Sequence, residues 1–295
     1  MVEPPELLIA RLTKASRVER IACEFGALQF RYWAGPKGGE TVLLVHGGSG
    51  SWLHWVANIE ALTQHYQVWA VDLPGLGASD ALPAGYTAED AVAALVAGCR
   101  GLKSLQQYHL VAFSWGCAVS SQAALQLGDA VKSLTLIGPA SIGDVSRKGG
   151  MKPLQRRVPG MSAADLAALH RLNLHHLMIS DPAKIDALAL KVQVLNTAQA
   201  RFNSPKFAKN RMVLDAVRQL RQPVQVIYGD QDGPALPDVA SKSALFFAEN
   251  PLVHFELVAN CGHWLAFEQP ESFHELLNAW VLGCVRAQAD VGGVG

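Results

Sequence analysis

Residues 108–121 read YHLVAFSWGCAVSS and decide the fold. The apolar run 110–113 is typical of a buried strand, and the small residues that follow favour a helix. Ser114 lies between the two, so the chain passes from strand to helix over one residue. A corner this tight strains the backbone of its central residue and requires small neighbours, and Ala112 and Gly116 meet that requirement. The pattern therefore predicts a serine side chain that projects from the end of a strand.

The overall composition indicates a large apolar core without a charge bias. Half of the 295 residues are apolar, which is enough for one α/β domain with an insertion. Lys plus Arg equals Asp plus Glu at 25 each, so no overall field attracts nucleic acid or an acidic membrane surface. The balance hides a basic segment, because residues 141–220 hold thirteen Lys and Arg against five Asp and Glu.

Cysteine usage and the N-terminal sequence bear on the compartment. The five cysteines are scattered and form no CxxC pair, which argues against a disulfide framework and against a zinc cluster. The N-terminus places acidic residues before its short apolar patch, unlike a secretory signal. No apolar run approaches the roughly 18 residues that a membrane span needs. We therefore expect a soluble cytoplasmic protein with neither nucleic acid nor membrane as a partner.

Apolar runs alternate with helical patterns before position 140, which favours parallel strands joined by right-handed crossovers. These runs are 41–45, 67–71, 110–113 and 131–137. From Pro139 the alternation stops for roughly 80 residues, a stretch too long for a simple connection. It resumes with the apolar run 224–228. We expect an α/β fold with a mostly parallel central sheet flanked by helices.

The interruption also predicts the domain organisation. Residues 1–140 and 222–290 are expected to form the α/β core. Residues 141–221 are expected to form a helical cap inserted over the carboxyl ends of the strands, where sheets of this kind place their sites. The tail, residues 291–295, is expected to be disordered.

A glycine-rich loop, HGGSG at 46–50, follows the first of the predicted parallel strands. Glycines let a backbone turn sharply and bring its N–H groups close to a ligand, as an oxyanion site requires. The alternative is a plain glycine turn. The loop lacks the GK[ST] ending of a phosphate-binding loop, which argues against nucleotide binding.

Three residues with complementary chemistry each follow a predicted strand: Ser114, Asp232 or Asp230, and His263. A serine hydroxyl becomes a good nucleophile only when a neighbouring base removes its proton, and that base needs a third group to orient it. Because the carboxyl ends of parallel strands meet at one edge of a sheet, the three side chains are expected to converge. The alternatives are a small core serine, a structural histidine and aspartates that shape a turn.

The stations HGGSG, AFSWG, GDQD and CGHW occur in that order, and with them the chain from about 30 to 286 resembles the α/β-hydrolase superfamily. By this resemblance Ser114 is the nucleophile, His263 the general base and Asp232 the orienting carboxylate. Asp232 is preferred to Asp230 because relatives with a GxxD turn direct the last residue of that turn toward the histidine. The backbone N–H groups of Gly48 and Trp115 form the implied oxyanion hole. No metal and no cofactor is implied.

The resemblance also bounds the substrate. A serine at the elbow excludes haloalkane dehalogenases and epoxide hydrolases of this fold, which use aspartate there. The cap and the HGGSG and CGHW stations further resemble meta-cleavage product hydrolases, which split carbon–carbon bonds in vinylogous diketone acids. The loop lacks the proline of those enzymes, and the elbow AFSWG departs from their usual GNSMG. We therefore rank a carboxylic-ester hydrolase first, a carbon–carbon hydrolase second and a ligand-binding receptor third.

The expected partner is a small-molecule substrate. Three side chains are candidates for contacting it: Phe113, Arg201 and Trp264. Arg201 could hold a substrate carboxylate. The alternative for Arg201 is a surface charge on a helix.

Overall fold

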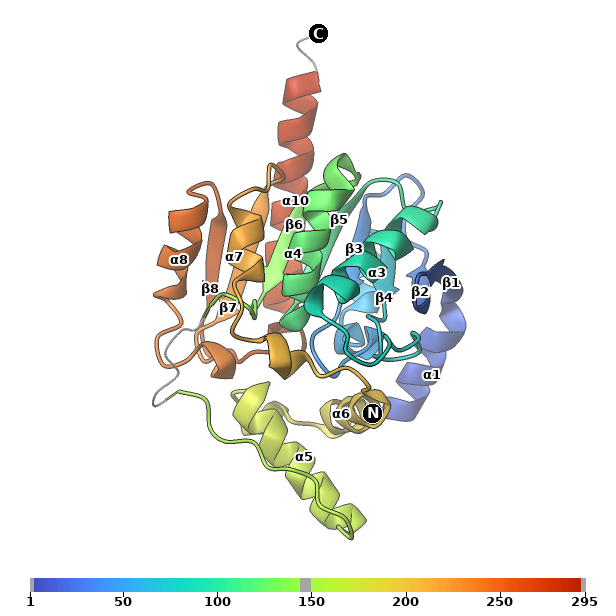
Figure 1. The fold of residues 1–295 in the computed structure, drawn as a ribbon, viewed down its shortest axis with the longest axis vertical. Helices are drawn as coiled ribbons and strands as arrows, with labels where there is room; N and C mark the ends of the chain where they lie inside the picture. Colours follow the sequence, from blue (N-terminus) through green and yellow to red (C-terminus); the bar gives the residue numbers. More distant parts are fainter. Residues whose placement is uncertain (1–2, 144–149, 293–295) are drawn as a thin grey trace.

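A computed structural model describes residues 3–143 and 150–292, within which eight strands form one sheet (Figure 1). The strand order is β1-β2-β4-β3-β5-β6-β7-β8. β1 and β2 pair antiparallel, as do β2 and β4, and all later neighbours pair parallel. The strands are β1 (Arg17–Cys23), β2 (Gly26–Trp33), β3 (Thr41–Val45), β4 (Gln67–Val71), β5 (Tyr108–Phe113), β6 (Val131–Ile137), β7 (Val224–Gly229) and β8 (His254–Val258). The predicted α/β fold with a mostly parallel sheet is confirmed.

Both faces of the sheet are covered, which is why its central strands bury apolar side chains on both faces instead of alternating between apolar and exposed polar residues. Successive side chains of β3 point to opposite faces, so Val42 and Leu44 enter one core and Leu43 and Val45 the other. One face is covered by α3 (Ala88–Gly101), α4 (Trp115–Leu127), α7 (Met212–Val217) and α8 (Lys242–Glu249). The other is covered by α1 (Pro5–Ala15), η1 (Trp52–Trp55), α2 (Ile59–Leu62), α9 (Leu265–Glu268) and α10 (Pro270–Gly292).

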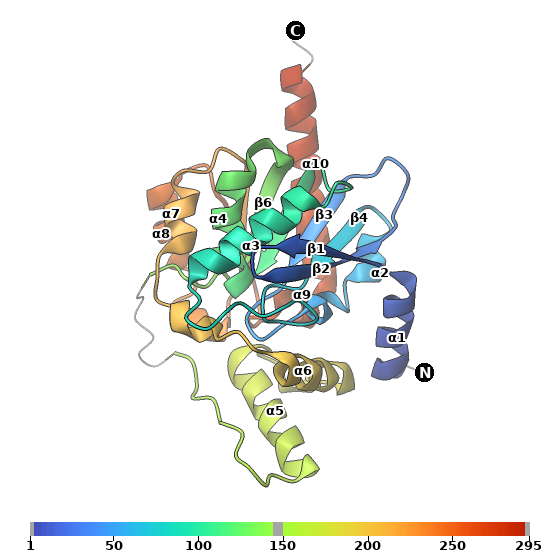
Figure 2. The same cartoon turned by 45° about the vertical axis from the view of Figure 1, so that its right-hand side comes forward.

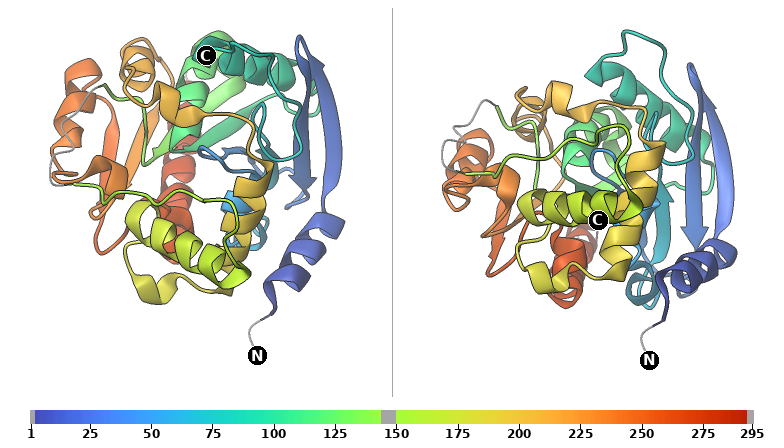
Figure 3. Two further views of the ribbon diagram at one scale, coloured as in Figure 1. Left: turned by 60° about the horizontal axis from the view of Figure 1, so that its bottom comes forward. Right: turned by 90° about the horizontal axis from the view of Figure 1, so that it is seen from below.

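The segment between β6 and β7 contains the whole of the expected cap, 141–221, of which residues 144–149 lie outside the described ranges. It contributes α5 (Ala163–Leu177), η3 (Pro182–Lys184), α6 (Ala187–Gln199), η4 (Ser204–Phe207) and α7. α5 and α6 lie beyond one edge of the sheet, at the end opposite to that from which α10 projects (Figures 1 and 2). Figure 3 shows the same two helices, in yellow-green and gold, crossing in front of the core when the molecule is seen from below. α7 instead packs against α4 and α8, so this last helix of the expected cap belongs to the core.

Two helix starts illustrate how the sequence sets element boundaries. Thr87 and Asp90 form a capping box at the start of α3, in which each side chain bonds the backbone N–H of the other. Ser162 and Asp165 do the same for α5. α10 continues to Gly292, so the first two residues of the expected disordered tail extend this helix, and residues 293–295 lie outside the described ranges.

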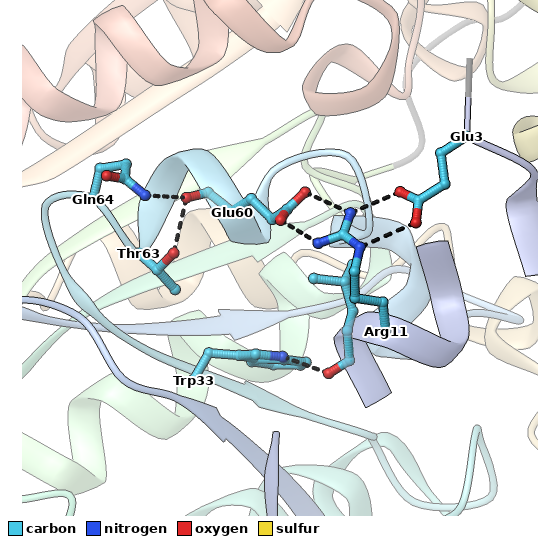
Figure 4. A network of polar contacts seen from close by, with 7 residues as sticks. Glu3, Arg11, Trp33, Glu60, Thr63 and Gln64 are labelled. Carbon is cyan, nitrogen blue, oxygen red and sulfur yellow. Dashed lines mark hydrogen bonds and ion pairs between the residues drawn. The ribbon is translucent and has the colours of Figure 1, made fainter. Parts of the chain in front are cut away.

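The N-terminal helix α1 is tied to the core by polar contacts (Figure 4). The guanidinium of Arg11 lies between the carboxylates of Glu3 and Glu60, and Glu60 belongs to α2. The indole N–H of Trp33 donates to the carbonyl oxygen of Leu12 at 2.8 Å. Within the described ranges, none of the helices combines the length and the apolar character that crossing a bilayer requires.

Candidate active site

The turn between β5 and α4 holds Ser114 in a strained backbone conformation. Its φ is 53°, in the region that residues other than glycine rarely adopt. The Ser114 N–H donates to the carbonyl oxygen of Ile137 at 2.9 Å, which ties the turn to β6. A Cβ at Gly116 would lie 2.4 Å from the carbonyl oxygen of His46, so only glycine fits two residues after the serine. The backbone at the start of the glycine loop therefore leaves room only for glycine at position 116, and this close approach allows the predicted corner.

The side chains of Ser114, His263 and Asp232 form one hydrogen-bonded series. Nε2 of His263 lies 2.9 Å from Oγ of Ser114, and Nδ1 of His263 lies 2.7 Å from Oδ2 of Asp232. The other oxygen of Asp232 accepts the Ala235 N–H at 3.1 Å, which fixes the rotation of the carboxylate. This arrangement suits an imidazole that carries its proton on Nδ1 and accepts the serine proton at Nε2.

The alternative carboxylate, Asp230, has a different partner. Its Oδ1 accepts the backbone N–H of Cys261 at 3.2 Å, so this side chain braces the loop that carries His263. Asp232 is fully buried, whereas Asp230 is partly exposed. Of the two aspartates at the end of β7, only Asp232 hydrogen-bonds the imidazole of His263.

The glycine loop is held against the serine by buried contacts. His46 donates from Nδ1 to the carbonyl oxygen of Gly47 at 2.7 Å and accepts the Leu73 N–H at Nε2 at 2.9 Å. Burial lowers the pKa of His46, which keeps the ring neutral for this pair of bonds. Gly48 in this loop and Trp115 at the start of α4 both line the cavity that contains Ser114. Among the described residues, the backbone N–H groups of these two have no hydrogen-bond acceptor.

A cavity of about 380 Å³ opens above Ser114 and His263. Its wall is largely apolar, and α5 and α6 supply part of it. The polar side chains from the segment between β6 and β7 are all uncharged: Asn173, Gln193, Thr197 and Ser204. None of the described residues that line this cavity is a lysine, arginine, aspartate or glutamate. The chamber therefore suits an uncharged ligand of modest size.

Comparison with known families gives one decisive match. The model of the alpha/beta hydrolase fold family matches residues 40–270, which is more than half of the chain. The chain belongs to the α/β-hydrolase family.

Curated relatives of this α/β-hydrolase are named for different activities. It is 27% identical over 257 residues to the dihydrolipoyllysine-residue acetyltransferase component of the acetoin cleaving system from Cupriavidus necator, a match that covers 85% of this chain but only 66% of that protein. It is 25% identical over 256 residues to a 2-hydroxy-6-oxononadienedioate/2-hydroxy-6-oxononatrienedioate hydrolase from Paraburkholderia phymatum (81% of this chain, 86% of the relative). It is 28% identical over 258 residues to a 2-hydroxy-6-oxo-2,4-heptadienoate hydrolase from Pseudomonas putida (81% and 88%).

Solved structures similar to this α/β-hydrolase include an esterase and a meta-cleavage product hydrolase. Naproxen esterase from Bacillus subtilis superposes with a TM-score of 0.72 at 20% identity, covering 94% of this chain and 97% of that one. A meta-cleavage product hydrolase from Pseudomonas fluorescens IP01 superposes with a TM-score of 0.65 at 21% identity, covering 88% and 95%. At these identities the likeness shows the fold alone. The comparisons place the chain among hydrolases without separating the two activities.

The three candidate substrate contacts have different positions in this α/β-hydrolase. Phe113 lines the cavity. Arg201 does not line it, because its guanidinium donates to the carbonyl oxygen of Ser79 at 2.6 Å. Trp264 is buried beneath the site, where its indole N–H donates to the carbonyl oxygen of His54 at 2.9 Å. The expected roles of Arg201 and Trp264 in holding substrate therefore have no support from their positions.

Two residues at this site escaped the sequence analysis. His54 lines the cavity, and Glu268 bonds the N–H of Gly262, next to His263, at 2.8 Å. Neither stands in a pattern with known chemistry. A buried histidine or glutamate is visible only once the surrounding chain is placed, because sequence alone does not show which polar side chains are taken out of water.

Proposed function

We propose that this α/β-hydrolase cleaves a small-molecule carboxylic ester through an acyl-enzyme on Ser114. The main support for this function is one observation. Oγ of Ser114, the ring of His263 and the carboxylate of Asp232 form a continuous hydrogen-bonded series whose serine end opens into the cavity. A nucleophile, its base and the group that orients the base are what acyl transfer requires.

In this mechanism His263 removes the proton of the Ser114 hydroxyl as the oxygen attacks the ester carbonyl. Asp232 stabilises the imidazolium that forms. The backbone N–H groups of Gly48 and Trp115 bind the developing oxyanion. His263 then returns the proton to the departing alcohol, and a water activated by the same imidazole releases the acid from the serine.

The uncharged cavity favours an ester over the acids that carbon–carbon hydrolases split. A bound carboxylate needs a cation or several N–H donors to replace its water, because an unpaired charge is costly to bury. The described lining holds no lysine or arginine, the guanidinium of Arg201 is bonded elsewhere, and the side-chain amide of Asn173 is bonded to the backbone of Gln155. Carbon–carbon hydrolysis is the second candidate, since the relatives from Paraburkholderia phymatum and Pseudomonas putida are named as hydrolases of 2-hydroxy-6-oxo acids, which resemble the substrates of meta-cleavage product hydrolases.

We also propose that α5 and α6 act as a cap over the nucleophile. They supply Asn173, Leu177, Gln193 and Thr197 to the cavity wall, and they lie at the edge of the sheet where Ser114 emerges. The five cysteines are free thiols in the structure, which is in keeping with the cytoplasm as the place where the enzyme works.

The test compares two substrates in wild type and in Ser114→Ala. Wild type should turn over p-nitrophenyl butyrate in a steady state, with a kcat/KM above that for a 2-hydroxy-6-oxo-dienoic acid. Ser114→Ala should lose this turnover while keeping its circular dichroism spectrum. Ser243→Ala, on the surface helix α8, serves as the matched control. A larger kcat/KM on the dienoic acid would favour the second candidate, and a single burst without turnover would favour a receptor.

A further inference from the structure

His54 is a buried polar side chain in the wall of the proposed ester site. It belongs to η1, directly after the glycine loop, and only 3% of its surface is exposed. Its ring packs edge-on against Phe113, with centroids 5.4 Å apart, and lies 5.2 Å from the ring of Trp264. Phe113 also packs against His263, with ring centroids 4.9 Å apart. The ring of Phe113 therefore lies between His54 and the proposed base.

The hydrogen bond on one ring nitrogen settles where His54 carries its proton. The backbone N–H of Gly47 donates to Nδ1 at 3.3 Å, so Nδ1 acts as the acceptor and Nε2 carries the hydrogen. Burial, reinforced by the nearby His46 and His263, lowers the pKa of His54 well below its usual value. The ring therefore stays neutral and offers one N–H donor at Nε2.

This donor has no acceptor among the described residues, and it is not sealed inside the protein. Nε2 of His54 has no hydrogen-bond partner within the described ranges, and part of its surface stays open. Because His54 lines the cavity, the N–H can reach a molecule bound in it. An apolar ring would pack equally well against Phe113 and Trp264 and would not bring a polar group out of water.

We propose that the Nε2–H of His54 determines specificity by donating a hydrogen bond to an uncharged oxygen of the substrate, beside the scissile ester group. The ligand class is an ester that carries an ether, ketone or hydroxyl oxygen on its acyl or its alcohol part. This rests on the proposed function of the site. His54 is not an additional base, because the Ser114 hydroxyl is already bonded to His263 and the Nδ1 of His54 is occupied by Gly47.

Two pairs of esters of equal size probe the donor, one for each part of the substrate. On the acyl side, p-nitrophenyl methoxyacetate is compared with p-nitrophenyl butyrate. On the alcohol side, 2-methoxyethyl butyrate is compared with butyl butyrate. Within each pair an ether oxygen replaces a methylene, so the ratio of kcat/KM, divided by the ratio of alkaline hydrolysis rates, reports recognition of that oxygen.

Two variants separate the donor from the role of His54 in holding Gly47. In His54→Asn the amide oxygen can take the place of Nδ1 and accept the Gly47 N–H, but no atom replaces Nε2. In His54→Gln the longer amide brings an N–H group toward the position of Nε2. The corrected ratio for one pair should be roughly 3- to 10-fold in wild type, fall to about one in His54→Asn and recover in part in His54→Gln.

A second readout measures binding without turnover. In Ser114→Ala, with and without His54→Asn, tryptophan fluorescence is titrated with 2-methoxyethyl butyrate and butyl butyrate and with methyl methoxyacetate and methyl butyrate. For one pair, the ratio of the two affinities should fall in the double variant by about the same factor as the corrected ratio of kcat/KM falls in His54→Asn. Trp115 lies in the cavity wall and provides the signal.

The outcomes distinguish this inference from the proposed function. Loss of the ratio for one pair supports the donor role and tells which part of the ester carries the oxygen. An equal loss on all four esters, with the ratios unchanged, overturns it and leaves His54 as a support for the glycine loop. If wild type turns over no ester, ester hydrolysis fails, and the binding ratios alone then decide whether His54 selects an oxygen.

Discussion

Glu268 and Ser180 are joined by two hydrogen bonds. The Ser180 hydroxyl donates at 2.7 Å to one oxygen of the Glu268 carboxylate, and the Ser180 N–H donates at 3.0 Å to the other. The same carboxylate accepts the N–H of Asp181 and, at 2.8 Å, the N–H of Gly262 beside His263. One buried side chain in α9 thus fastens the segment after α5 to the loop that carries the proposed base.

Replacing Glu268 by glutamine should loosen both segments together. In glutamine an NH2 group replaces one of the two carboxylate oxygens that accept hydrogen bonds. At least one backbone N–H that now bonds Glu268 therefore loses its acceptor. Hydrogen bonds to charged groups contribute about 1.5 to 3 kcal/mol each. We expect Glu268→Gln to lower the free energy of unfolding in urea by about 2 to 4 kcal/mol and to lower kcat on p-nitrophenyl butyrate. Glu275→Gln, on an exposed face of α10, is the matched control. Equal midpoints for the two variants would contradict this role.

The two aspartates after β7 should differ sharply in their effect on turnover. Asp232→Asn keeps the shape of the side chain but removes the charge that orients and stabilises the His263 ring, which bonds it at 2.7 Å. We expect a loss of about 10³- to 10⁴-fold in kcat. Asp230→Asn should cost less than about tenfold, because an amide oxygen can still accept the Cys261 N–H. Steady-state kinetics at pH 7.5 checks both, and a larger loss for Asp230→Asn would exchange the proposed roles.

The space beside Gly48 predicts a compensating pair of substitutions. A Cβ at Gly48 would lie 2.1 Å from Oγ of Ser204 and 3.1 Å from its Cβ. Gly48→Ala should therefore displace the loop and its N–H, and loss of one oxyanion donor typically costs about 10²- to 10³-fold in kcat. Adding Ser204→Ala removes the closer of the two contacts and should restore part of that activity. The single variant Ser204→Ala gives the reference rate. Absence of any recovery would mean that the hydroxyl is not the obstacle.

Buried histidines, of which His46, His54 and His109 are the least exposed, predict a loss of stability in mild acid. Burial lowers the pKa of His46 and of His54, and it lowers the pKa of His109 to about 4. In the unfolded chain the same groups take up protons below about pH 6.5. Between pH 6.5 and their folded pKa values the unfolded state therefore binds more protons, so the free energy of unfolding falls as the pH falls. Each histidine contributes up to about 1.4 kcal/mol per pH unit.

Urea midpoints at pH 7.5, 6.0 and 5.0 measure this dependence. Stability should be constant above about pH 7, where all three rings are neutral in both states. His109→Gln should flatten the decline by removing one of these contributions. A midpoint that rises as the pH falls from 7 to 5 would mean that these rings are protonated in the folded protein.

The sequence by itself determined the order of the secondary structure and the corner at Ser114. Both are local consequences of residue type, because apolar runs form the buried strands and a turn of one residue excludes side chains at Gly116. It also indicated that Ser114, Asp232 or Asp230, and His263 meet at one sheet edge, since parallel strands end there together. The resemblance to α/β-hydrolases added the implied oxyanion role of the glycine loop and the preference for Asp232.

Only the tertiary structure decided which side chains face the cavity. Asp232 and Asp230 are two positions apart, and their directions depend on where β7 ends. Arg201 is turned toward Ser79, while His54 faces the cavity with one nitrogen bonded to Gly47. The physical reason is that burial and hydrogen bonding arise between segments far apart in the chain, so whether a polar side chain meets a backbone group, a ligand or water depends on what the fold places beside it.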